Sequence, residues 1–211
     1  MYLAVGTRPD ISFSVSVLSQ FLENPSEVHW KAAKRTLRYI AGTYNIEIEF
    51  NSSITLTAYS DADYGSCLDT RKSVSGVILT LNGGPIIWFS RKQEVIATST
   101  TDAEYIAAHD ATKKIVWTRG ILEELGISQL KPTVLHRNNI AAGQLINNPV
   151  FYRHTKHIDI KFHYTRDIIK QGSLLVKHAA SNEQLADILT KPLAREKFVT
   201  NRTKINLVKA C

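Results

Sequence analysis

Between residues 53 and 92 the chain adopts a pattern typical of β-sheet, and this pattern constrains the fold more than any other feature. Segments 53–61, 73–81 and 85–92 are rich in β-branched and large apolar residues, and the first alternates between polar and apolar positions. The sequence Asn-Gly-Gly at 82–84 is typical of a tight hairpin turn. Three strands this close together in the chain predict a meander.

After the meander, helical and strand patterns alternate. Segment 100–126 is predicted to be helical, and its small residues repeat every fourth position at Ala103, Ala107 and Ala111, which favours close packing on a sheet. Further strands are predicted at 133–136 and 173–178, and further helices near 139–147, at 157–172 and at 181–193, where Pro192 limits the last helix. This order predicts an α/β fold with a mixed five-stranded sheet flanked by helices.

The first 50 residues read as a helical appendage. Two helices are predicted within 9–42, and Asn-Pro-Ser at 24–26 separates them. The second helix has an apolar face (Trp30, Ala33, Leu37 and Ile40) and a basic stripe (Lys31, Lys34, Arg35 and Arg38). We therefore expect a helical segment at 1–50, an α/β domain at 54–195 and a C-terminal tail at 196–211.

Charge and cysteine content narrow the class of protein. The net charge of +7 fits a polyanionic partner such as nucleic acid, although a merely basic protein has the same charge. With only Cys67 and Cys211, a disulfide framework and a cysteine-built zinc site are excluded. No apolar run has transmembrane length and no secretory leader is recognisable, so we expect an intracellular protein, cytoplasmic or nuclear, that is not secreted.

Three acids stand at positions where an α/β fold can gather them. Asp61 ends the first strand, Glu104 lies in the first turn of the long helix, and Asp187 lies on the last helix. Each acid also has an ordinary explanation. Asp61 fits a polar strand exit, Glu104 fits a capping box with Thr101 as N-cap, and Asp187 fits a solvated acid on a helix surface. Together they match the carboxylates that hold two divalent metal ions. A calcium loop starting at Asp61 is excluded because Ser66 stands where glycine is required.

With these residues in view, the chain resembles the Pol polyprotein of copia-type LTR retrotransposons over nearly its whole length. "YLAVGTRPDISFSVSVLSQF" and "HWKAAKRTLRYIAGT" resemble the end of the reverse transcriptase. "YSDADYGSCLDTRKSVSGVILTLNGGPIIWFSRKQ", "STTDAEYIA", "NPVFYRHTKHIDIKFHYTRD" and "EQLADILTKPL" resemble successive blocks of the RNase H region. Because Met1 falls inside this pattern, we expect a fragment of Pol or a degenerate insertion.

The resemblance implies an RNase H fold that cuts the RNA strand of an RNA–DNA hybrid with two Mg²⁺ (or Mn²⁺) ions. By motif, Asp61 matches the first catalytic carboxylate, Glu104 the second and Asp187 the fourth, and these three are the implied metal ligands. His178 is implied to assist product release, although copia members need not carry a histidine there.

The third catalytic position departs from the family pattern. The block that normally reads like "DNQSA" is "NNIAA" here, so Asn138 stands where the family carries aspartate. No acid occurs between Glu124 and Asp159, so no close neighbour in sequence replaces the lost charge. We expect a weak or inactive nuclease that keeps its fold.

Hybrid binding is expected to survive the loss of one carboxylate. The resemblance implies two partners, an RNA–DNA hybrid and an upstream reverse transcriptase region, and no membrane. The expected phosphate contacts come from Lys31, Lys34, Arg35, Arg38, Arg71, Lys72, Arg153 and Lys156.

Three alternatives stay open, and the oligomeric state is also undetermined. A non-catalytic nucleic-acid-binding or structural module with the same fold is the main one. An integrase is disfavoured by the missing zinc module and by the reverse transcriptase-like N-terminus. Only surface charge favours a protein-binding scaffold.

Overall fold

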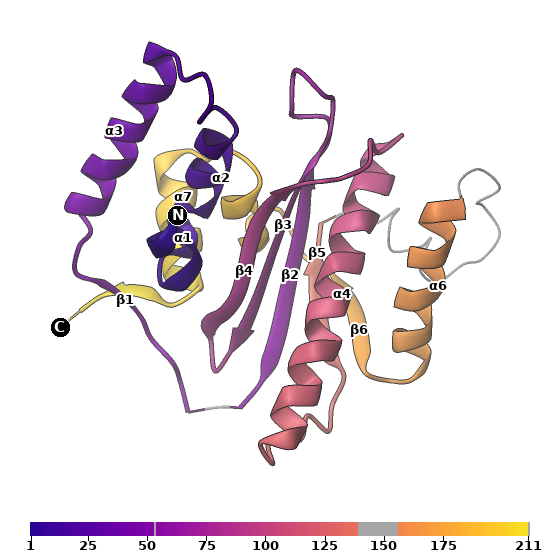
Figure 1. The fold of residues 1–211 in the computed structure, drawn as a ribbon. Helices are drawn as coiled ribbons and strands as arrows, with labels where there is room; N and C mark the ends of the chain where they lie inside the picture. The colour runs from indigo at the N-terminus through magenta and orange to yellow at the C-terminus, as the bar shows by residue number, and fades with distance from the viewer. Residues whose placement is uncertain (53, 139–155, 211) are drawn as a thin grey trace.

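A five-stranded mixed sheet forms the centre of the computed structural model, which describes residues 1–52, 54–138 and 156–210, without the side chains of 156–162 (Figure 1). Its strand order is β4-β3-β2-β5-β6. The strands are β2 (Leu56–Asp63), β3 (Val74–Leu81), β4 (Gly84–Lys92), β5 (Thr133–Arg137) and β6 (Leu174–His178). The α/β fold with a mixed five-stranded sheet, predicted from the sequence, is confirmed.

The pairing pattern places the carboxyl ends of three strands at the same end of the sheet. β2, β3 and β4 pair antiparallel as a meander. β5 pairs parallel with β2, and β6 pairs parallel with β5. The carboxyl ends of β2, β5 and β6 therefore lie at the same edge of the sheet. Asp61 lies near the end of β2, and Asn138 directly follows β5.

Helices α4 (Thr100–Glu124) and α6 (Lys156–Lys170) cover one face of the sheet (Figure 1). The predicted ladder of small residues on α4 lies against the sheet, with Ala103, Ala107, Ala111 and Ile115 fully buried. These residues allow the helix axis to approach the strands closely, and an apolar core forms between them. The helix predicted near 139–147 lies outside the described residues.

The opposite face of β3 and β4 carries a second core. It contains the 3₁₀ helix η2 (Leu185–Leu189), α7 (Arg195–Lys204) and a small antiparallel sheet of β1 (Ile46–Ile48) and β7 (Leu207–Lys209). The helix predicted over 181–193 is in fact limited to the short η2. The sequence predicts a C-terminal tail at 196–211, but this segment contains β7 and all of α7 except its first residue.

The N-terminal segment packs against β4 and η2. Its elements are α1 (Tyr2–Gly6), η1 (Pro9–Ile11), α2 (Ser12–Ser19) and α3 (Glu27–Ala41). The indole Nε1 of Trp88 on β4 donates a hydrogen bond of 2.7 Å to the carbonyl of Ala4. Helix α3 lies outside α2, away from the sheet (Figure 1).

The apolar face predicted for α3 is not buried. Trp30 is 59% exposed and Leu37 60% exposed, and no residue of the helix is buried. The pattern correctly indicated an amphipathic helix, but within the described residues no layer covers its apolar side. Nor is any described helix both long and apolar enough to cross a lipid bilayer.

Candidate active site

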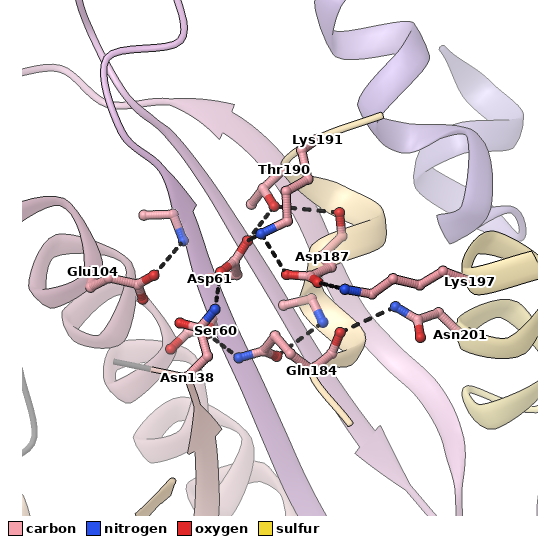
Figure 2. A network of polar contacts seen from close by, with 12 residues as sticks. Ser60, Asp61, Glu104, Asn138, Gln184, Asp187, Thr190, Lys191, Lys197 and Asn201 are labelled. Atoms are coloured by element: carbon pink, nitrogen blue, oxygen red, sulfur yellow. Dashed lines mark hydrogen bonds and ion pairs between the residues drawn. The ribbon is translucent and has the colours of Figure 1, made fainter. Parts of the chain in front are cut away.

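Four sequence-predicted site residues meet around the end of β2 (Figure 2). Asp61 comes from β2, Glu104 from the first turns of α4, Asn138 from the end of β5 and Asp187 from η2. Asp61, Glu104 and Asp187 are all buried. The fold thus brings together side chains that are 126 positions apart at the extremes of the sequence (187 − 61).

Asp61 lies at the centre of this cluster. One carboxylate oxygen accepts a hydrogen bond from the Asn138 amide at 3.4 Å. The other accepts a hydrogen bond from the Thr190 hydroxyl and lies 3.2 Å from the ammonium of Lys191. Burial raises the pKa of Asp61, while the charge of Lys191 opposes that rise.

Asp187 is held by two lysines. The ammonium of Lys191 lies 2.8 Å from one carboxylate oxygen, and that of Lys197 lies 2.5 Å from the other. Burial alone would lower the pKa of Lys191, but Asp61 and Asp187 outweigh it and raise that pKa. Lys191 therefore bridges two of the three acids.

A glycine allows η2 to reach the sheet. Gly76 of β3 pairs with Asp61 across the ladder. A Cβ atom at this position would lie 2.6 Å from Thr190 Cγ2 and 2.8 Å from Leu189 Cβ, closer than carbon atoms can pack. The absence of a side chain at Gly76 is what lets η2 place Asp187 and Thr190 beside Asp61.

Glu104 faces the strand rather than its own helix terminus. The N-cap of α4 is Ser99, whose hydroxyl accepts a hydrogen bond from the Asp102 N–H at 3.1 Å. The capping box predicted from Thr101 and Glu104 is therefore wrong. Glu104 instead accepts a hydrogen bond from the Ala62 N–H at 3.4 Å, and no hydrogen-bond partner of its second oxygen is found among the residues that the structure describes.

This environment shifts the ionisation of Glu104. Burial, followed by the nearby charge of Asp61, raises the pKa of Glu104 to about 8 from an ordinary 4.5. The Ala62 N–H, Arg137 and Lys191 oppose the shift without cancelling it. The raised pKa favours the protonated form of Glu104 at neutral pH.

A pH-dependent stability follows from this shift. Below pH 4.5 the carboxyl is protonated in both states, whereas between 4.5 and about 8 only the folded state keeps the proton. The free energy of unfolding therefore falls as pH rises through this window and becomes flat above it. We expect Glu104→Gln to remove this contribution, so that the variant gains stability relative to the wild type as pH rises. Urea unfolding in chelator, at several pH values across the window, measures it; parallel curves for both proteins would contradict it.

The other predicted residues lie away from the acids. His178 ends β6, is exposed and pairs in register with Arg137, and no contact of it with the three acids is found among the described side chains. Lys31, Lys34, Arg35 and Arg38 lie on α3, and Arg71 and Lys72 lie in the loop between β2 and β3. Arg153 and the side chain of Lys156 lie outside the described residues.

The sequence analysis did not identify three further residues of the site, Lys191, Lys197 and Thr190. Lys191 stands four residues after Asp187, a spacing that often marks an ion pair, and could have been found by it. Lys197 lies beyond Pro192 on a separate helix, and no local pattern links it to Asp187.

We tested whether these residues fit the implied metal ions. Carboxylate oxygens are the ligands that Mg²⁺ prefers. Here, however, Asp61 and Asp187 are already paired with lysines, and the third corner is an amide. Within the described part of the chain, no three acidic, histidine or cysteine residues are grouped so that they could hold one ion. As arranged, the residues do not fit a two-metal site, and we assign no step to a bound metal.

Comparison with known proteins decides the family. No family model matches the chain. The retrovirus-related Pol polyprotein from transposon RE2 of Arabidopsis thaliana is 41% identical over 210 residues, which are 99% of this chain and 14% of the polyprotein. The corresponding polyprotein from transposon TNT 1-94 of Nicotiana tabacum is 43% identical over 199 residues, 94% of this chain and 15% of the polyprotein. The chain belongs to the copia-type Pol family.

The chain matches only part of these polyproteins, and it is also similar to other proteins. The chain spans about one seventh of the copia-type Pol polyproteins it matches, at 14 to 15% of their length. The secreted RxLR effector protein 161 of Plasmopara viticola is 46% identical over 119 residues, which are 56% of this chain and 84% of that protein. Among solved structures, LC11-RNase H1 in complex with RNA/DNA hybrid is similar at a TM-score of 0.47 and 16% identity, covering 64% of this chain and 94% of that one.

Proposed function

We propose that this chain is a copia-type RNase H domain that binds RNA–DNA hybrids and whose hydrolysis of the RNA strand is impaired. The observation that carries the proposal is the convergence of Asp61, Glu104 and Asp187 at the end of β2, with Asn138 beside them at the third corner. Family membership supports the identity of these positions.

The impairment follows from the chemistry of Asn138. An amide at this corner contributes no negative charge, and its nitrogen donates a hydrogen bond to Asp61. Lys191 and Lys197 form ion pairs with two of the remaining acids, Asp61 and Asp187. A cluster with this charge attracts a divalent cation much less than four carboxylates do.

The basic residues supply the binding part of the proposal. The stripe on α3 is exposed, and Lys31 forms an exposed ion pair of 2.9 Å with Glu27. Such a pair is worth little, so the lysine stays available for phosphate contacts. These contacts would fix the position of a nucleic acid without reading its sequence.

Salt dependence tests the binding part. The affinity for a labelled hybrid is measured by fluorescence anisotropy at several salt concentrations. We expect the logarithm of the association constant to fall steeply and linearly with the logarithm of the salt concentration. Replacing Lys34 and Arg35 by glutamine should reduce that slope by about two, since each lost phosphate contact removes roughly 0.9. Lys113→Gln, on α4 and paired with Asp110, is the matched control and should leave the slope unchanged. Binding that is insensitive to salt would contradict the phosphate contacts.

A non-catalytic module with the same fold is the second candidate function. The ion pairs of Lys191 and Lys197 favour it, because they satisfy Asp61 and Asp187 within the protein itself. A hybrid-cleavage assay separates the two candidates, since only the first one cuts RNA.

A further inference from the structure

One basic side chain links two of the three acids. The ammonium of Lys191 lies between Asp61 and Asp187, 3.2 Å from a carboxylate oxygen of the first and 2.8 Å from one of the second (Figure 2). Both carboxylates are almost fully buried, with 1% and 2% of their side chains exposed. The positive charge of Lys191 therefore offsets the cost of burying these two negative charges side by side.

We propose that Lys191 is the resident counter-ion of the site, so that a divalent cation reaches Asp61 and Asp187 only by displacing its ammonium group. The inference rests on the proposed function for the kind of cation that would enter. It goes beyond that function by assigning to Lys191 the control of cation entry.

The local charge balance supports this role. Asp61 and Asp187 carry two negative charges, and Lys191 and Lys197 carry two positive charges in direct contact with them. A divalent cation would therefore enter a pair of acids that is already neutral. If Lys191 moved away, one negative charge would be uncovered at the position between the two carboxylates.

Lys191 is built so that it can leave. Its side chain is 34% exposed, while the carboxylates it bridges are buried. The ammonium sits on a flexible four-carbon stem that can swing into water without disturbing the backbone. Of the two acids, Lys197 pairs with Asp187 and not with Asp61 in the described structure, so its departure would uncover only one acid.

The consequence is a site that is stable without metal. With the lysine in place, buried Asp61 keeps an ion pair and the Thr190 hydrogen bond, and needs no cation from solution to hold the fold. We therefore expect the wild-type protein to unfold at the same temperature in chelator and in added Mn²⁺.

Titration with Mn²⁺ alone tests the proposal. Binding is measured by electron paramagnetic resonance of the free ion, with the folded chain and without nucleic acid. Removing one positive charge beside the site should tighten Mn²⁺ binding in Lys191→Gln by at least about tenfold. Lys191→Arg keeps the charge and should bind as weakly as the wild type. Lys113→Gln removes an equal charge from a distant surface pair and should also match the wild type.

Each outcome is decisive. Mn²⁺ binding in Lys191→Gln that equals or falls below that of the wild type would overturn the proposal, because Lys191 would then not compete with the cation. If circular dichroism shows that Lys191→Gln is unfolded, Lys191→Met, which keeps an unbranched side chain without the charge, gives the second test. Tighter Mn²⁺ binding is again expected, and unchanged binding would contradict the proposal. Since no hybrid is present, a failure of hybrid binding or cleavage affects the proposed function and leaves this measurement unaffected.

Discussion

Replacing Asn138 by aspartate is expected to raise the rate of RNA-strand cleavage in Mg²⁺ by up to about a thousandfold. The amide lies 3.4 Å from a carboxylate oxygen of Asp61, so the new charge would enter the centre of the acid cluster. A unit charge at about 4 Å is worth roughly 4 kcal/mol at an effective dielectric of about 20. That energy corresponds to about a thousandfold in rate, and screening by Lys191 makes it an upper value.

The matched control for this variant is Asn139→Asp, which adds the same charge one residue later. We expect it to leave cleavage at the wild-type level, because the family motif places the third acid at position 138. Equal gains from both variants would mean that net charge, not the corner of the site, limits the reaction.

Replacing Asp10 by alanine is expected to have the largest effect on stability. Arg8 and Asp10 form a two-bond ion pair at 2.9 Å for both contacts, with 6% and 0% of their side chains exposed. Asp10 also accepts a hydrogen bond from Tyr39, which in turn accepts one from Arg202 of α7. Removing the acid leaves the buried Arg8 guanidinium without its carboxylate counter-ion, although its hydrogen bonds to Thr43 stay. Such a change typically lowers the free energy of unfolding by about 3–5 kcal/mol.

Urea unfolding measures this loss, and an exposed ion pair provides its control. Glu27 pairs with Lys31 at the same 2.9 Å, but 77% and 67% of their side chains are exposed. We expect Glu27→Ala to change the free energy of unfolding by no more than about 0.5 kcal/mol. Similar losses in Asp10→Ala and Glu27→Ala would contradict the view that this network joins the N-terminal segment to α7.

The fold was predictable where the pattern is local. The meander strands follow the two-residue period of a strand, and the small residues of α4 follow the period of a helix. Both elements are found in the structure where these patterns predict them. The β1–β7 pair joins two three-residue segments some 160 positions apart (207 − 46 = 161), and nothing near either one marks a strand. The helix predicted over 181–193 is limited to η2, and Leu189 and Thr190 at its end pack directly on Gly76 of the sheet.

The site was predictable only as far as motifs reach. The resemblance located Asp61, Glu104 and Asp187, and the structure places them around one strand end. Their protonation and pairing depend on burial and on side chains from other elements. Neither the raised pKa of Glu104 nor the contact of Lys197 with Asp187 follows from residue spacing.

Single-turnover cleavage of an end-labelled RNA–DNA hybrid tests the central claim, that Asn138 is the defective corner of an RNase H-type site. Three proteins are compared in Mg²⁺: the wild type, Asn138→Asp, and Asn138→Asp combined with Asp61→Asn. The account expects slow or no cleavage by the wild type, a large gain in Asn138→Asp, and the loss of that gain in the double variant. Wild-type cleavage as fast as that of Asn138→Asp, or a gain that persists without Asp61, would contradict it.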